Sequence, residues 1–389
     1  MHIAEDNEFV AKTFHGLEEV LAEEIKNIGG ENIEILTRAV RFTGNKELLY
    51  KSNIYLRTAL RVLVPIANRN VRSNKDIYKI AKTFKWEDIF SPEQTFLVSA
   101  VTNSKHIDHS YYAALKFKDG IADRFREKFQ KRPSVDKEKP DYKIDLHISG
   151  TNCTISLDSS SESLHKRGYK ESNVLAPLSE ALGAGLILLS GWDKQSPFID
   201  PMCGSGTLPI EACMIANDIP PGIFRTSFGF KRWNNFDKSI FQSITNNVNI
   251  HPSKSVKIIG SDISEKAIQT ARLNCENAEF EQSIKLFVRD FKDFKPEEED
   301  SKGTLIMNPP YDVKMKERDI ENFYKEIGDT LKNNFQDFDA WIFSANLKAL
   351  KNIGLRTSRK IPLYNGALES RFNNYKIFKG SIKNKKTSE

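Results

Sequence analysis

The segment Asn308-Pro309-Pro310-Tyr311 has residue types that could perform chemistry, and it follows the apolar run Thr304–Met307. Two prolines fix φ and remove two N–H donors, so the backbone there is rigid and rich in acceptors. The side-chain oxygen of Asn308 and the adjacent proline carbonyl can together accept both hydrogens of an amino group, which draws the nitrogen lone pair out of conjugation. The Tyr311 ring offers a stacking surface for a base. We predict that Asn308, Pro309, Pro310 and Tyr311 are catalytic and present an exocyclic amino group to an activated methyl group.

Such a transfer needs no general base at the start, because the methyl donor is already activated and catalysis is mostly positioning. A base has to be unstacked or flipped to reach a pocket of this kind. By itself the segment allows adenine, cytosine, guanine or glutamine as the acceptor. The alternative is that it merely ends a loop; the apolar strand before it and a glycine-rich loop three strands earlier favour the catalytic interpretation.

That glycine-rich loop is Asp200-Pro201-Met202-Cys203-Gly204-Ser205-Gly206-Thr207. Its glycines let backbone N–H groups approach a ligand closely at a helix N-terminus. The pattern is not GxxxxGK[ST], which disfavours a nucleotide P-loop. The loop also opens with an acid, which would repel a pyrophosphate but can accept from the ammonium of a methionine-like group. The alternative is a tight turn between a strand and a helix that binds nothing.

Two more acids, Asp262 and Asp290, stand where later strands are expected to end. Asp262 can accept hydrogen bonds from both ribose hydroxyls, as an acid does in dinucleotide-binding folds, and Asp290 can accept from an adenine amino group. About fifty residues separate Gly206 from Asp262, against roughly twenty in the dinucleotide fingerprint, so residues 218–254 are expected to be an insertion. The alternative for each acid is a helix cap, and Asp262 with Glu265 fits a capping box.

The elements that must position these residues are short apolar strands that alternate with helices from about Ser161 onwards. This alternation predicts an α/β fold with a largely parallel sheet covered on both faces. Ligands of such sheets bind beyond the carboxyl ends of the strands, which is where the loop, the acids and Asn308 fall. The expected strands are Phe198–Asp200, Val256–Asp262, Ile284–Asp290, Gly303–Asn308 and Ala340–Ala345.

Two α+β blocks precede this part of the chain. Residues 9–57 are expected to form a strand, a helix, two strands and a helix, which is the material of a small ferredoxin-like unit. Residues 58–160 combine strands with a long helix over Ser110–Phe129 and a hairpin around Ser149-Gly150-Thr151. Since 389 residues are too many for one ordinary domain, we predict three, with limits 1–58, 59–160 and 161–389.

Composition excludes several classes of protein. The apolar content of 39% and charged content of 28% are typical of soluble globular proteins. The longest apolar stretch, around Ala181–Leu189, is too short to span a bilayer, and the N-terminus lacks an export signal. We therefore expect a cytoplasmic protein without a membrane partner. Four cysteines without a CxxC pair and seven histidines without clustered spacing argue against a metal site and a disulfide framework.

The net charge of +6 is unevenly distributed. Between Arg57 and Lys85 there is one acid, Asp76, and the segment after Tyr375 is rich in lysine. Such runs can be ordinary solvated surface, but beside base chemistry they are consistent with a polyanion partner. The basic residues between Arg57 and Lys85 are Arg61, Arg69, Arg72, Lys75, Lys79 and Lys82.

Together these motifs resemble the THUMP-containing class I RNA methyltransferases, and among them the bacterial large-subunit ribosomal RNA guanine-N2 methyltransferases of the RlmL type. The resemblance extends over essentially the whole chain. The catalytic-domain motifs are specific in combination, whereas the THUMP match rests on layout. The segments that carry the resemblance are Asp200–Thr207, Leu164–Tyr169, Ala176–Leu178, Asn308–Tyr311, Pro221-Gly222, Phe228–Trp233 and Leu363–Glu369.

The resemblance implies a Rossmann-like class I methyltransferase domain that uses S-adenosylmethionine, preceded by ferredoxin-like and THUMP domains that grip RNA. Asp262 would hold the ribose of the cofactor and Asp290 its adenine amino group. Larger bacterial relatives have a second methyltransferase domain that makes 7-methylguanine; this chain ends at Glu389, so that activity is expected to be absent. The implied cofactor-binding residues are Pro177, Asp200, Met202, Cys203, Gly204, Ser205, Gly206, Thr207, Asp262, Ile263, Asp290 and Asn308.

Four basic residues, Lys166, Arg167, Lys231 and Arg232, are expected to contact RNA. The alternative for Lys166 and Arg167 is ordinary linker surface. Lys231 and Arg232 lie in the predicted insertion, among aromatic residues that could stack on the target strand. For those rings, packing onto the domain is the favoured alternative. They are Phe228, Phe230 and Trp233.

The predicted function is transfer of a methyl group to N2 of a guanosine in large-subunit (23S) ribosomal RNA. A tRNA guanine-N2 methyltransferase would use identical chemistry and stays an alternative. A DNA adenine-N6 or protein-glutamine methyltransferase would share the Asn308 segment, but the N-terminal blocks argue against both. A non-catalytic RNA-binding factor of ribosome assembly is the alternative from another class; the intact loop, the three acids and the Asn308 segment argue against it.

Overall fold

The computed structural model describes residues 7–170, 178–252, 256–297, 302–310 and 317–378. They form two compact units. The N-terminal unit comprises the residues up to Thr13, Leu21–Lys166 and Arg225–Asn247. The C-terminal unit comprises Phe14–Val20, Arg167–Phe224 and the residues from Val248 onwards.

The N-terminal unit contains one seven-stranded sheet with the order β2-β3-β1-β4-β7-β6-β5. Only β5 and β6 among these neighbours run parallel. The ferredoxin-like and THUMP-like layouts therefore share a single sheet, because β1 pairs with β4 through Val10↔Leu63 and the two residue pairs after it. The strands are β1 (Asn7–Lys12), β2 (Glu31–Leu36), β3 (Ala39–Gly44), β4 (Arg61–Asn70), β5 (Phe96–Asn103), β6 (Tyr142–Ser149) and β7 (Asn152–Asp158).

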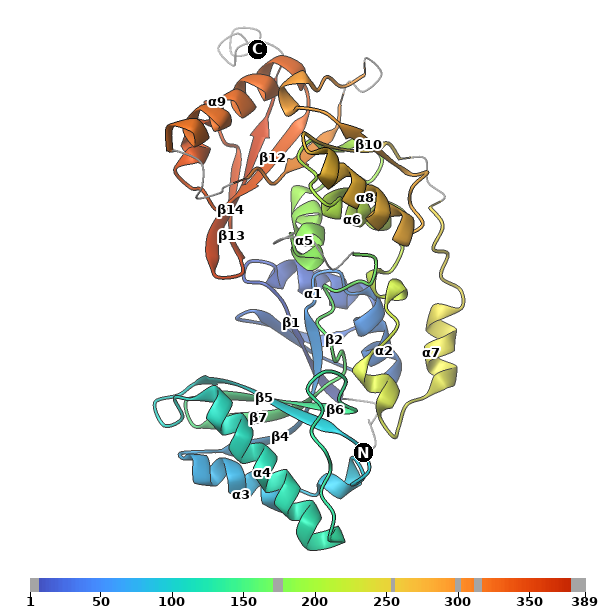
Figure 1. The fold of residues 1–389 in the computed structure, drawn as a ribbon, viewed down its shortest axis with the longest axis vertical. Coiled ribbons are helices and arrows are strands. Elements are labelled where there is room, and N and C mark those ends of the chain that lie inside the picture. Colours follow the sequence, from blue (N-terminus) through green and yellow to red (C-terminus); the bar gives the residue numbers. More distant parts are fainter. Residues whose placement is uncertain (1–6, 171–177, 253–255, 298–301, 311–316, 379–389) are drawn as a thin grey trace. The chain divides into compact units, whose positions relative to one another are not determined.

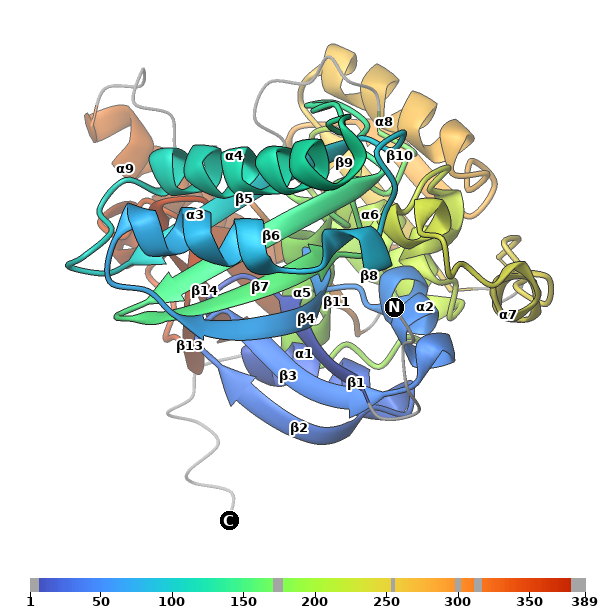
Figure 2. The same ribbon diagram turned by 90° about the horizontal axis from the view of Figure 1, so that it is seen from below.

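Two helices, α3 (Asn74–Thr83) and α4 (Ser110–Phe129), lie side by side near β5 and β6 (Figures 1 and 2). Gly120 of α4 permits their close approach, since a Cβ atom there would lie 2.6 Å from the carbonyl oxygen of Tyr78 in α3. Ser73 caps α3 by accepting from the backbone N–H of Asp76. The same unit contains α2 (Lys46–Tyr55), and α1 (Glu18–Asn27) spans the division between the units.

The predicted insertion supplies residues 225–247 to the N-terminal unit. It contains the 3₁₀ turn η3 (Gly229–Arg232) and helix α7 (Lys238–Thr245). Phe230 is fully buried, and its ring stacks on that of Tyr50 with 4.3 Å between centroids. Phe228 and Trp233 are buried in the same core. The rings therefore pack, as the alternative held, and the core that they join is that of the N-terminal unit.

The C-terminal unit contains the second seven-stranded sheet, with the order β10-β9-β8-β11-β12-β14-β13. Strands β8 to β12 run parallel, and β13 and β14 form an antiparallel hairpin against β12. The predicted Rossmann-like α/β fold is confirmed. Chain order reverses at β8, which lies between β9 and β11. The strands are β8 (Phe198–Asp200), β9 (Ile258–Asp262), β10 (Ile284–Val288), β11 (Thr304–Met307), β12 (Asp339–Ser344), β13 (Arg359–Asn365) and β14 (Leu368–Lys376).

Adjacent residues of these strands point into different cores. Phe198 and Ile306 pack in one hydrophobic cluster with α5 (Glu180–Ser190) and α6 (Thr207–Ala216), whereas Ile199 and Leu305 pack in another with α9 (Glu317–Asn334). This alternation is the period of two of a strand buried on both faces. Figure 1 shows α6 and α8 (Glu265–Asn277) on one side of β12 and α9 on the other.

Among the described residues, no helix is both long enough and apolar enough to cross a membrane. The same part of the chain contains no group of three or more His, Cys, Asp or Glu side chains arranged to hold a metal ion. All four cysteines are buried free thiols.

Candidate active site

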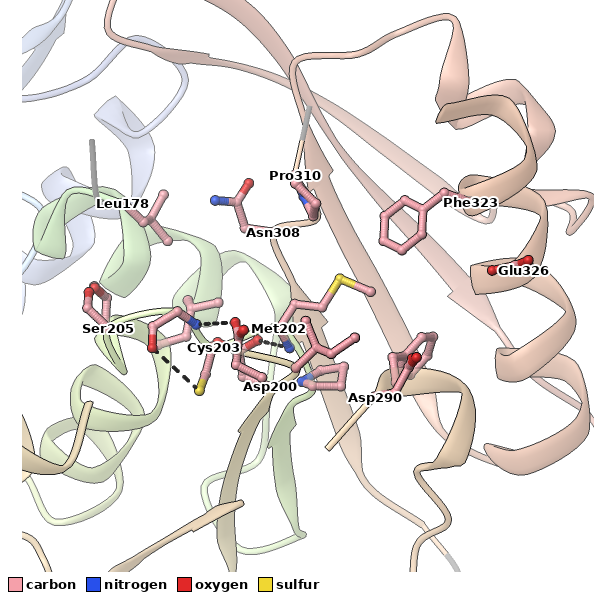
Figure 3. Close-up of a pocket in the computed structure, with 17 residues that line it drawn as sticks. Leu178, Asp200, Met202, Cys203, Ser205, Asp290, Asn308, Pro310, Phe323 and Glu326 are labelled. Carbon is pink, nitrogen blue, oxygen red and sulfur yellow. Dashed lines mark hydrogen bonds between the residues drawn. The ribbon is translucent and has the colours of Figure 1, made fainter. Parts of the chain in front are cut away.

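A cavity of about 630 Å³ opens at the carboxyl ends of the central strands of the C-terminal unit (Figure 3). It lies where the strand order reverses, which is the usual ligand site of an open α/β sheet. Most of the predicted cofactor residues line it. Those that do are Asp200, Met202, Cys203, Gly204, Ser205, Thr207, Asp262, Ile263, Asp290 and Asn308.

Backbone hydrogen bonds hold the glycine-rich loop against the neighbouring strand and turn it into α6. The N–H of Cys203 donates to the carbonyl of Ser261 at 2.8 Å, and the N–H of Gly206 donates to the carbonyl of Cys203 at 2.8 Å. Gly204 has φ +52°, and a Cβ atom there would meet nothing within 4 Å, so the loop leaves open space beside it. Gly206 has φ +83° and packs against α8, where a Cβ atom would come within 3.1 Å of the Ala271 Cβ. Gly206 therefore serves the turn and the packing of α8, and it does not line the cavity.

Asp200 is the last residue of β8, and its side chain is buried. Its Oδ1 accepts from the backbone N–H of Met202 at 3.2 Å. Burial raises the pKa of Asp200 well above its ordinary value, and the nearby charge of Asp262 raises it further. A cationic group beside this carboxylate would offset both effects.

Asp262 connects β9 to the loop. Its Oδ2 accepts from the backbone N–H of Gly204 at 3.0 Å, and its Oδ1 accepts from that of Ser264 at 2.9 Å. Helix α8 is capped by Ser264, whose side chain accepts from the N–H of Ala267. The alternative of a capping box between Asp262 and Glu265 is therefore wrong. Ile263, next in the chain, is 70% exposed and lines the cavity.

Asp290 follows β10 and caps the 3₁₀ turn η4 (Phe291–Asp293). Its side chain accepts from the backbone N–H of Lys292 at 3.1 Å, and the Lys292 ammonium lies 3.1 Å from the other carboxylate oxygen. The capping role and the cavity position coexist here, since Asp290 also lines the cavity. The strand itself ends at Val288, so the carboxylate lies just beyond the third strand and not, as predicted, at its last residue.

Asn308 comes directly after β11 and lines the same cavity. Figure 3 shows its side chain between those of Leu178 and Pro310. The Asn308 Oδ1 is buried and accepts no hydrogen bond from any residue that the structure describes. A buried acceptor left in this state costs free energy on the order of 1–3 kcal/mol, which a ligand donor would recover. Pro309 is buried and does not line the cavity; Tyr311 and Pro177 lie outside the described residues.

Six lining residues were not among the predicted site residues. Phe323 faces the cavity from α9 in Figure 3, and Glu326 lies one turn further along. Their spacing in the sequence is that of an ordinary amphipathic helix, so nothing marked them as site residues. Leu178 is the last residue of the Ala176–Leu178 motif, which is the one available signal. The other three are Pro201, Leu208 and Phe291.

The predicted RNA contacts fall in different environments. Arg167 is 1% exposed, and its Nε lies 3.3 Å from the buried Glu211 Oε1, which also accepts from the Tyr169 hydroxyl at 3.2 Å. This burial contradicts the prediction that Arg167 contacts RNA; the side chain instead neutralises a buried carboxylate. Lys166 is exposed, and its ammonium lies 3.3 Å from Glu162. RNA contact by Lys166 stays a prediction.

Lys231 and Arg232 belong to the N-terminal unit. The Lys231 side chain is exposed, with its ammonium 4.6 Å from the centroid of the Phe241 ring. Arg232 is half-buried and donates from Nη1 to the carbonyl of Pro140 at 2.7 Å. Its guanidinium thus helps to fix the insertion, and RNA contact by either residue stays a prediction.

Three family models match successive parts of the chain. The RlmL ferredoxin-like domain matches residues 8–63, the THUMP domain matches residues 71–158, and the RMKL-like methyltransferase domain matches residues 167–374. The third match alone covers more than half of the chain, and it contains every predicted cofactor residue.

Individual proteins are similar over nearly the whole chain. A candidate RNA methyltransferase of Synechocystis sp. is 36% identical, over 95% of this chain and 97% of its own length. The ribosomal RNA large subunit methyltransferase K/L of Syntrophotalea carbinolica is 35% identical over 95% of this chain, which spans only 53% of that relative. The crystal structure of SMU.472, a candidate methyltransferase in complex with SAH, is 26% identical with a TM-score of 0.85, over 97% of this chain and 100% of that one.

Proposed function

The chain belongs to the RMKL-like methyltransferase family, with an RlmL-type ferredoxin-like domain and a THUMP domain ahead of the methyltransferase domain, and on this premise we propose that it methylates guanine N2 in large-subunit ribosomal RNA. S-adenosylmethionine is the methyl donor in this proposal. The domain limits that we propose are 1–58, 59–160 and 161–389.

The acceptors around the cavity fit this donor. S-adenosylmethionine supplies an activated methyl group on its sulfonium. Asp200 would hold the ammonium of the methionine portion, because a cation there offsets the burial that raises the pKa of this carboxylate. Asp262 would accept from the ribose hydroxyls and Asp290 from the adenine amino group. The open space beside Gly204 allows a ligand to approach the loop backbone closely.

The observation that carries the proposal is the buried Asn308 Oδ1, which has no donor among the described residues. An exocyclic amino group has two hydrogens to donate, and Asn308 with the carbonyl of Pro309 offers two acceptors for them. Holding both hydrogens in this way keeps the nitrogen lone pair out of the ring conjugation and free to attack. The residues position the amine and withdraw no proton at the start, so catalysis would be mostly orientation.

The choice of RNA and of guanine rests on the relatives. The two related proteins are named for RNA and for large-subunit ribosomal RNA methylation, and the chain contains a THUMP domain at residues 71–158. Asn308 by itself would serve adenine or cytosine equally well. We therefore infer the polymer and the base from the family, and the amino-methylation chemistry from the site.

Competition between nucleic acids tests the substrate. Purified protein with labelled S-adenosylmethionine should transfer label to deproteinised large-subunit RNA taken from a strain that lacks the enzyme. Transfer RNA and duplex DNA, added in excess, should neither accept label nor inhibit. Labelling of transfer RNA instead would favour the tRNA enzyme, and labelling of DNA would rule out an RNA methyltransferase.

Binding of the cofactor distinguishes the proposed enzyme from a non-catalytic assembly factor. Calorimetry with S-adenosylmethionine should show one site per chain. An absence of any binding heat, with a melting temperature unchanged by the ligand, would favour the RNA-binding factor.

A further inference from the structure

A second cavity, of about 230 Å³, lies in the N-terminal unit and shares no residue with the candidate active site. We name it the basic pocket after its four cationic residues. They are Arg61, Lys137, Lys143 and Lys166, opposed by Glu138 and Glu162.

Two of the cations that line the basic pocket, Arg61 and Lys143, meet at Asp158 at the end of β7. The strand pairs with β4 through Leu63↔Asp158 and with β6 through Ile144↔Leu157, so Arg61 and Lys143 approach it from opposite sides. The Arg61 Nη1 donates to the Asp158 Oδ2, and the Lys143 ammonium lies 3.7 Å from that same oxygen. The carbonyl of Ser161 also accepts from both, at 2.7 and 3.4 Å.

Two cations thus share one carboxylate, which is 1% exposed. Asp158 can neutralise only one of them. Burial lowers the pKa of Lys143, and the adjacent Arg61 charge lowers it further. At the rim, Lys166 lies 3.3 Å from Glu162, but exposed pairs of this kind contribute little. Asp145 also faces Lys143, but the Lys12 ammonium pairs with it at 2.9 Å. Four cations against Asp158, Glu138 and Glu162 therefore leave a positive excess that an anion can offset.

We propose that the basic pocket binds a phosphate group of the RNA backbone, an inference that rests on the proposed function. The guanidinium groups of arginine and the ammonium groups of lysine recognise phosphate oxygens. At ~30 Å³ for each water, the volume corresponds to about seven or eight waters, which is room for a phosphate. The lining contains no aromatic ring on which a base could stack, so a backbone phosphate fits better than a free nucleotide.

Such a contact positions RNA without reading its sequence. Residues 161–166 of the pocket directly precede the methyltransferase match, which begins at residue 167. A phosphate held by the four cations of the basic pocket would therefore fix the RNA beside the segment that leads into the catalytic domain. Binding at this pocket should act on RNA affinity and not on S-adenosylmethionine affinity.

Salt dependence of RNA binding by the full chain tests the proposal. Lys137→Gln and Lys166→Gln remove rim cations that come from different loops but face one cavity. If both act on one phosphate, the double variant should bind RNA about tenfold more weakly at low salt. Its plot of log K against log salt should be less steep by about 0.7–0.9, the value for one phosphate. An unchanged slope, or a decrease corresponding to two phosphates, would overturn the shared site.

Lys131→Gln is the matched control. Lys131 is 58% exposed and lies 2.9 Å from Glu93, which closely parallels Lys166 at 60% and 3.3 Å from Glu162. The RNA affinity and the salt slope of Lys131→Gln should equal those of the wild type. A decrease equal to that of the rim variants would show a general charge effect and would also overturn the proposal.

Acylation of the Lys143 amine, followed by mass spectrometry, identifies the source of the phosphate in the unaltered protein. Micromolar large-subunit RNA should protect Lys143, whereas inorganic phosphate should protect it only at far higher concentration. Protection by phosphate alone would indicate a free-anion site and overturn the RNA assignment. Both readouts measure binding without methyl transfer, so failure of the pocket and failure of the proposed reaction are separate results.

Discussion

Asn308 follows the central strand β11 with a buried Oδ1 that no described residue contacts as a donor. Replacing this side chain removes an acceptor for the substrate amine but leaves the three acids in place. Asn308→Ala should lower kcat by about 10²–10³-fold, the loss typical when one preorganised hydrogen-bonding group is removed from a reacting centre. S-adenosylmethionine affinity should stay within a factor of about two of the wild type.

Transfer of labelled methyl groups and calorimetry with the cofactor measure these two quantities separately. Asn322→Ala, an exposed position on α9, serves as the control and should be fully active. Normal turnover by Asn308→Ala would exclude the proposed role of its side-chain oxygen.

Asp262 has two functions in the structure, since it lines the cavity and accepts from the Gly204 N–H at 3.0 Å. Asp262→Ala should weaken S-adenosylmethionine binding by about 10- to 100-fold, as expected for the loss of hydrogen bonds to a charged group. Calorimetry measures the change, with the exposed Asp329→Ala as a control. Unchanged affinity for S-adenosylmethionine would mean that Asp262 only stabilises the glycine-rich loop through its hydrogen bond with Gly204.

We predict that Asp200 makes cofactor binding sensitive to pH. Burial raises the pKa of this carboxyl well above its ordinary value, so it keeps its proton to a higher pH than an exposed aspartate does. Only the ionised form offers a negative charge to pair with an ammonium. S-adenosylmethionine affinity should therefore rise as the pH rises through the pKa of Asp200, and Asp200→Asn should bind weakly without this rise. A wild-type affinity that is flat over the same range would contradict the assignment.

At the residue scale, most of the predicted cofactor residues line one cavity, whereas one predicted RNA contact, Arg167, is buried. The loop and Asn308 follow apolar strands, so the local pattern places them at the sheet edge that binds ligands. Arg167 carries no such signal. Its partner Glu211 is 44 positions further along the chain, and only the folded structure reveals that the two are buried together.

At the element scale, the packing of residues 225–247 gives a stability test. Phe230 is fully buried against Tyr50 in the core of the N-terminal unit. Phe230→Ala should destabilise that unit by about 3–5 kcal/mol, as large-to-small changes in a core do. Hydrogen exchange should show lost protection in β4, β6 and β7. Phe287→Ala, at a residue 38% exposed in β10, should have little effect. Lost protection confined to the C-terminal unit would contradict the assignment of the insertion.

The order of strands and helices along the chain was largely predictable from the sequence. The pairing of strands that belong to different predicted blocks was not. Periodicity of apolar residues indicated the strands and helices of both units, because each strand or helix buries a face of its own. The pairing of β1 with β4 joins segments about fifty residues apart into one sheet. The spacing between Gly206 and Asp262 predicted an insertion, but the core that Phe228 and Trp233 join depends on surfaces that no local pattern describes.

At the scale of the whole molecule, the sharing of segments between units limits what truncation can test. A chain without residues 1–160 would keep residues 225–247 but lose the core in which Phe228, Phe230 and Trp233 are buried. Loss of RNA affinity in such a chain could come from exposed apolar surface. Point changes in the intact protein therefore separate RNA binding from catalysis more cleanly.

The most direct test of the central claim is the identity of the methylated nucleoside. Large-subunit RNA from a strain lacking the enzyme would be incubated with purified protein and S-adenosylmethionine, digested, and analysed by mass spectrometry against nucleoside standards. The account predicts a single new product, N2-methylguanosine, that is absent with Asn308→Ala. Appearance of N6-methyladenosine, or of no methylated nucleoside in large-subunit RNA while transfer RNA is modified, would contradict it.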